Sequence, residues 1–165
     1  VLLVLTCFNP VFWAFFEQAG SSLTLFAQRN VDRHFFGVEL AAGTVQNFGA
    51  AFVVMLGPVF AMLWTRCGDW NPPIPIKFSI GLALVAVGFL SLVWAARAVA
   101  TDGVVPLWPM ILLYWWFTCG ELCLSPVGLS MVTKLAPAPL GTTAMGTWFL
   151  STAVANFLAG QVAVL

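Results

Sequence analysis

The chain has 165 residues, of which 61% are hydrophobic and only 7% are charged, whereas about 25% of the residues of a typical soluble domain are charged. The 6 basic and 6 acidic residues cancel, so neither nucleic acid nor a polybasic membrane-surface segment is expected. Uncharged runs separate the few charges, and several are long enough to cross a bilayer, which takes about 20 residues as a helix. The composition excludes a soluble domain and predicts an all-α polytopic membrane protein.

Five transmembrane helices are predicted, at about residues 3–28, 44–64, 78–96, 107–131 and 142–164. The chain begins at Val1 inside an apolar segment and stops at Leu165 without a polar tail. We therefore expect residues 1–165 to be part of a larger polytopic protein. Positive charges are divided equally between the two sets of loops, so the positive-inside rule does not orient the chain.

The first predicted helix carries one charge, Glu17, on a stripe that is polar and aromatic rather than suited to lipid. At helical spacing this stripe contains Trp13, Glu17, Gly20, Ser21 and Thr24. We expect this stripe to line a water-filled space. In the loop that follows, His34 is interpreted as a solvated residue rather than a proton relay.

The second and third predicted helices differ in their small and kink-forming residues. Pro58 lacks an N–H group and is predicted to kink the second helix. The third has no interior charge and several small residues that allow close packing, so we expect it to be scaffold. These residues are Ser79, Gly81, Ala83, Ala86 and Gly88.

The fourth predicted helix contains Glu121, the only charge between Gly103 and Thr133. An ionisable group at the centre of a transmembrane helix costs about 3 kcal/mol and usually faces a cavity or a partner. Pro126 is predicted to break the helix near this acid. The stripe of Glu121 also contains Tyr114, Phe117, Thr118, Ser125 and Gly128.

Enzyme chemistry and metal binding are not expected. Cys119 and Cys123 share a helix face, but their spacing is not that of a zinc ribbon, and we interpret them as packing residues. The single histidine lies in a loop, and no HExxH or GxSxG motif is present. The small residues of the fifth predicted helix are interpreted as packing residues, and no cofactor is predicted.

Four motifs resemble the proton-dependent oligopeptide transporters of the major facilitator superfamily. They are GELCLSPVGLSMVTKLAP (120–137), FWAFFEQAGSSLTLFAQRN (12–30), PVFAMLW (58–64) and PIKFSIGL (75–82). The resemblance implies that the five helices are helices seven to eleven of a twelve-helix transporter, without its N-terminal half and last helix. It also implies a multi-pass protein of the plasma or inner membrane, with the first and third loops outside.

Site residues follow from matching these motifs one by one. Glu121 matches a glutamate near the amino terminus of the bound peptide, and Glu17 matches one implicated in proton coupling. Trp13 matches a cavity tryptophan, while Trp148 and Phe149 match an aromatic pair that shapes the side-chain pocket. Ser125, one turn from Glu121, is a further candidate.

One position departs from the family pattern. Gly49 stands where many members have an asparagine that contacts the peptide. Gln46 lies one turn earlier on nearly the same face and is the candidate replacement, whereas Asn47 points elsewhere.

The function implied by the resemblance is proton-coupled import of di- and tripeptides by alternating access, with protons as the coupling ion. Its partners are small peptides, the lipid bilayer and the missing N-terminal half. Two alternatives remain: a family member that carries nitrate or another small organic solute, and a remnant that transports nothing. For single residues, the alternatives are structural: Glu17 and Glu121 as hydrogen-bonded links between helices, Trp13 as packing, and Ser125 bonded to its own helix.

Overall fold

The structure is a computed structural model that describes residues 2–99 and 103–164. Val1 and Leu165, on which the expectation of a larger protein rests, lie outside the described residues, as do residues 100–102 of the third loop. In chain order the helices are α1 (Leu2–Phe16), η1 (Glu17–Gly20), α2 (Ser22–Asn30), α3 (Ala42–Val45), α4 (Asn47–Arg66), η2 (Gly68–Trp70), α5 (Ile74–Ala98), α6 (Trp108–Leu135), η3 (Ala138–Leu140) and α7 (Gly141–Val164), where η denotes a short 3-10 helix.

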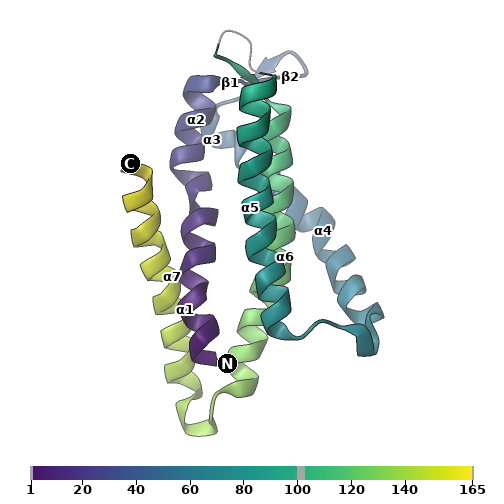
Figure 1. Ribbon diagram of the computed structural model, residues 1–165, viewed down its shortest axis with the longest axis vertical. Coiled ribbons are helices and arrows are strands. Elements are labelled where there is room, and N and C mark those ends of the chain that lie inside the picture. Colours follow the sequence, from purple (N-terminus) through teal and green to yellow (C-terminus); the bar gives the residue numbers. More distant parts are fainter. Residues whose placement is uncertain (1, 100–102, 165) are drawn as a thin grey trace.

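The long helices lie side by side in one bundle (Figure 1). Helices α5 and α6 form its centre, α1, α2 and α7 lie on one flank, and α4 lies on the other. The most extensive contacts join α5 to α6 and α1 to α7. Among the described residues, four helical stretches are long and apolar enough to cross a membrane: Ala42–Arg66, Ile74–Ala98, Trp108–Leu135 and Gly141–Val164. The all-α polytopic fold predicted from composition is confirmed.

Short strands at one end of the bundle join two loops. β1 (Val31–Asp32) pairs in parallel with β4 (Val105–Pro106), and β2 (His34–Phe35) pairs with β3 (Val38–Glu39) in an antiparallel hairpin. The first and third loops therefore meet at the same end, as expected when two helices lie between them.

An ion pair and a side-chain hydrogen bond connect residues of the exposed hairpin and β1. The guanidinium of Arg33 lies 2.7 Å from a Glu39 carboxylate oxygen, and the His34 ring lies 2.6 Å from Asp32. The hydrogen bond from the His34 side chain holds the pKa of the Asp32 carboxyl below its usual value. This contribution to stability is present above the unfolded pKa of Asp32 and is lost as pH falls through its folded pKa. His34 is exposed, in agreement with its interpretation as a solvated loop residue.

The first predicted helix is interrupted in the structure. Instead of one helix over about 3–28, the 3-10 segment η1 separates α1 from α2, and the Ser21 N–H donates to the Gln18 carbonyl at 3.1 Å. The Gln18 side chain is 3% exposed. Its Nε2 donates to the Ala14 carbonyl at 3.0 Å and to the Ala159 carbonyl of α7 at 3.1 Å. A buried amide thus satisfies backbone oxygens beside the interruption, which begins at Glu17.

The three prolines inside long helices, Pro10, Pro58 and Pro126, do not interrupt them. The prediction of a break at Pro126 was wrong, because α6 is helical from Trp108 to Leu135, and α4 likewise continues through Pro58. A proline removes one N–H group and frees one carbonyl, four residues earlier. Packing of α6 against α5, α4 and α7 holds the remaining helix in place.

Glycines bring the backbones of α5 and α6 into contact. A Cβ atom on Gly120 would lie 2.8 Å from the Gly81 carbonyl oxygen, and one on Gly81 would lie 3.0 Å from the Gly120 oxygen. About two helical turns further along α5, a Cβ on Gly88 would lie 3.1 Å from the Phe117 ring. Close packing by the small residues of this helix is confirmed at Gly81 and Gly88, and it fixes the helix that carries Glu121.

Gly120→Ala is expected to destabilise the protein by about 1–3 kcal/mol, because the added methyl group meets a backbone oxygen that cannot turn away. Thermal unfolding of the full-length protein in detergent measures the loss. The matched control is Gly146→Ala, where the new Cβ has no neighbour within 4 Å and alanine is the better helix former by about 1 kcal/mol. An unchanged melting temperature for Gly120→Ala would contradict the close approach.

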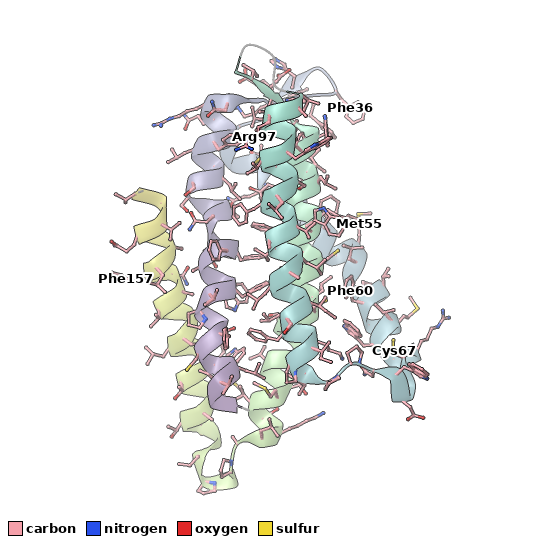
Figure 2. All side chains as sticks on the ribbon, in the orientation of Figure 1. Phe36, Met55, Phe60, Cys67, Arg97 and Phe157 are labelled. Atoms are coloured by element: carbon pink, nitrogen blue, oxygen red, sulfur yellow. The ribbon has the colours of Figure 1, made fainter. Side chains whose placement is uncertain are left out.

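Large apolar side chains cover the outside of the bundle. Phe157 of α7 is 67% exposed and Val54 of α4 is 76% exposed. Figure 2 shows Phe157 on the outer side of α7, pointing away from α1. Leu56 is the one buried residue among the described residues of α4. Such a surface suits lipid or further transmembrane helices rather than water.

Candidate functional site

A cavity of about 340 Å³ lies between η1, α4 and α6. Both acids that the sequence singled out, Glu17 and Glu121, line it, and both are half-buried. We call it the acidic cavity, and its polar lining consists of Glu17, Gln46, Tyr114, Thr118 and Glu121. No lysine, arginine or histidine lines it among the described residues. Two carboxylates in one partly desolvated space favour a cation or a proton as their companion.

Different features of the chain position the two acids. Glu121 is in the middle of the continuous helix α6, which the glycine contacts with α5 hold in place. Glu17 is the first residue of η1, where the α-helix gives way to a 3-10 turn. One acid is therefore carried by the rigid centre of the bundle and the other by an irregular segment on its flank.

The start of α4 contributes the third wall of the acidic cavity. Gln46 and Gly49 both line it, and the Thr118 hydroxyl donates to the Gly49 carbonyl at 3.4 Å. A Cβ on Gly49 would lie 3.7 Å from the Tyr114 ring, so a longer side chain here would take up cavity space. Asn47 instead lines an apolar groove with Phe35, which agrees with the prediction that it points elsewhere.

A second cavity, of about 230 Å³, lies between α1, α6 and α7. We call it the aromatic cavity, and its lining is Trp13, Leu124, Ser125, Leu129, Trp148, Phe149 and Thr152. Trp148 is 4% exposed and packs over Gly128, where a Cβ atom would lie 2.5 Å from the ring. The glycine thus makes room for the indole.

The predicted site residues fall into two groups. Glu17, Gln46 and Glu121 line the acidic cavity, and Trp13, Ser125, Trp148 and Phe149 line the aromatic cavity. An aromatic wall joins the groups, because Trp13 of the aromatic cavity packs edge-on against Phe16 of the acidic cavity, with ring centroids 5.3 Å apart. The roles assigned to these residues remain predictions.

Sequence reasoning missed Thr152 as a lining residue. The signal was available, because Thr152 follows Trp148 by one helical turn and must share its face. Ser125 has no side-chain hydrogen-bond partner among the described residues, so it does not bond back to its own helix there. Its hydroxyl is available to the aromatic cavity.

Cys119 and Cys123 are both buried in α6 as free thiols. Within the described residues no group of three or more His, Cys, Asp or Glu side chains is placed to hold a metal ion. Both thiols lie in the packed part of the helix, as expected of packing residues.

Known proteins are similar to this chain in sequence and fold. A family model described as POT family matches residues 1–165. The uncharacterised transporter YclF of Bacillus subtilis is 41% identical over 155 residues, which are 94% of this chain and 31% of YclF. The dipeptide and tripeptide permease A of Edwardsiella piscicida is 37% identical over 155 residues, again 94% of this chain and 31% of the relative. A crystal structure of the peptide transporter POT in complex with sulfate superposes with a TM-score of 0.88 at 35% identity, covering 96% of this chain and 32% of that one.

The bundle of long apolar helices around a polar-lined cavity is that of an all-α polytopic membrane protein. The chain belongs to the POT family. It is therefore a multi-pass membrane protein, and its matched relatives are transporters rather than enzymes. The chain spans about a third of the length of these relatives, 31% of each of the two compared by sequence and 32% of the crystallised transporter.

Proposed function

We propose that this chain supplies helices seven to eleven of a proton-coupled symporter that imports di- and tripeptides by alternating access. The observation that carries the proposal is the acidic cavity. Two carboxyl groups line it, and no basic side chain does so among the described residues. The similarity to a dipeptide and tripeptide permease supports the substrate class. Since the chain spans about a third of its relatives, we also propose that the remaining helices, including the opposing half, belong to the same transporter in its membrane.

The chemistry of a short peptide fits the two cavities. Its ammonium group would pair with Glu121 in the acidic cavity, with Gln46 as a neutral hydrogen-bonding neighbour. Its side chain would enter the aromatic cavity against Trp148 and Phe149, beside Ser125 and Trp13. Neither cavity has a basic residue among its described lining, so the cation that pairs with the peptide carboxylate would come from the opposing half.

Coupling requires a group whose charge changes while it is sealed from bulk water. Glu17 is assigned this role, with protons as the coupling ion and no other cofactor. At a membrane potential of 100 mV, the entry of one proton releases about 2.3 kcal/mol, which supports about a fifty-fold concentration ratio for a neutral peptide. One coupled proton would therefore suffice for useful accumulation.

Transport of another solute is the main alternative within the family. Two carboxylates in the acidic cavity work against nitrate or an organic anion, because an anion would have to enter beside like charges. They favour a substrate with a free amino group. The chain alone, lacking an opposing half, is not expected to alternate access and would transport nothing without it.

The test of the proposed function is uptake of a labelled dipeptide by the full-length protein in liposomes under an inward proton gradient. We expect concentrative uptake that unlabelled di- and tripeptides compete for and that a protonophore abolishes. Protein-free liposomes are the control. Uptake of none of these peptides, alongside uptake of an anion such as nitrate, would overturn the substrate assignment.

A further inference from the structure

Asn9 of α1 is a fully buried polar residue in the interface between α1 and α7. Its exposure is 0%, and its Nδ2 lies 2.8 Å from the Ser151 Oγ and 3.3 Å from the Thr152 Oγ1. A polar side chain inside a transmembrane bundle is costly unless it is bonded. The two hydroxyl groups of α7 provide that bonding across the interface.

The direction of each hydrogen bond follows from the number of protons that each hydroxyl or amide group can donate. The Ser151 hydroxyl donates its one proton to the Trp148 carbonyl at 2.6 Å, so its oxygen can only accept from Asn9. The amide nitrogen must therefore face α7. It supplies its second proton to the Thr152 oxygen, and the Thr152 hydroxyl proton stays free for another acceptor. The Asn9 Oδ1 is buried without a partner among the described residues.

This chain of bonds ends at the wall of the aromatic cavity. Asn9 does not line that cavity, but Trp148 and Thr152 both do. Trp148 and Thr152 lie on one turn of α7. Through its hydrogen bonds, Asn9 fixes the axial position and the rotation of this turn relative to α1. With its oxygen bonded to Asn9, Thr152 presents its hydroxyl hydrogen to the cavity or to a neighbouring acceptor.

We infer that Asn9 is a positioning residue that sets the shape of the aromatic cavity through Ser151 and Thr152, and thereby the choice among substrate side chains. The inference rests on the proposed function, because it assigns the aromatic cavity to the side chain of a transported peptide. It concerns which peptides are taken up rather than whether uptake is driven by protons.

The test compares two dipeptides, Ala-Ala and Ala-Phe, in the full-length transporter. Asn9→Asp keeps the size of the side chain but replaces its two N–H donors with at most one O–H, so Ser151 and Thr152 cannot both keep the bond that they accept. We expect the ratio of the two KM values to change by about three- to tenfold, the effect of one lost hydrogen bond. A merely structural defect would lower the maximal rate for both peptides and leave the KM ratio unchanged.

Two further variants keep the test decisive. Ser151→Ala breaks the same chain of bonds with a small change in volume, and it should shift the KM ratio even where Asn9→Asp fails to fold. Asn156→Asp is the matched control, because Asn156 is an exposed amide of α7 that donates to the Thr152 backbone carbonyl at 3.1 Å. Its KM ratio should equal that of the wild type.

The outcomes separate this inference from the proposed function. An unchanged KM ratio in Asn9→Asp and Ser151→Ala, with normal peptide uptake by the wild type, would overturn the role of Asn9 alone. Failure of the wild type to take up either peptide would overturn the proposed function and this inference with it.

Discussion

Glu121→Gln is expected to abolish concentrative dipeptide uptake by the full-length transporter. The substitution keeps the shape of the side chain and removes its charge, so the peptide ammonium would enter the acidic cavity with one carboxylate partner fewer. Removing one member of a buried ion pair costs about 3–5 kcal/mol, equivalent to a loss of affinity of about two to four orders of magnitude. Uptake in liposomes, measured beside the wild type, checks this.

A second substrate distinguishes charge pairing from a structural role of Glu121. An N-acetylated dipeptide lacks the ammonium group, so the wild type should strongly prefer the free peptide and the variant should bind the two about equally. If Glu121 only links helices, the variant would lose activity and keep the preference. Glu39→Gln, the same change at an exposed acid of the hairpin, should leave uptake at the wild-type level.

Helical periodicity accounts for the part of the site that could be predicted. Tyr114, Thr118 and Glu121 line one cavity because residues three and four apart share a face of α6. The same periodicity grouped Ser125 with them, yet Ser125 lies in the aromatic cavity. One further turn moves a residue about 5 to 6 Å along the helix axis, and Ser125 there lines the aromatic cavity together with Trp13.

The interruption of the first helix could not be predicted from local sequence. Proline is the usual local signal of a break, and it pointed to Pro126. The structure has its interruption at η1, where Gln18 donates to the Ala159 carbonyl of α7 across a sequence separation of 141 residues. Asn9 likewise finds Ser151 across 142 residues. Contacts between helices so far apart in the chain cannot be predicted from the periodicity of the sequence. These contacts nevertheless position the walls of both cavities.

Glu17→Gln is expected to abolish accumulation driven by a proton gradient while leaving peptide exchange intact. A glutamine resembles the protonated acid, so the site could still be occupied and could still alternate between the two sides of the membrane. It could not release a proton, and the roughly fifty-fold accumulation that one proton supports at 100 mV would fall to none. Gradient-driven uptake and counterflow into peptide-loaded liposomes measure the two activities separately.

The comparison with Glu121→Gln makes the assignment specific. If Glu121 binds the ammonium group and Glu17 carries the proton, the Glu121 variant loses both uptake and counterflow, and the Glu17 variant loses uptake alone. Wild-type accumulation by Glu17→Gln would show that another group carries the coupling proton, since a side chain that cannot titrate cannot transfer one. Loss of counterflow in both variants would instead mean that the two acids act together on the substrate, which their common cavity also permits.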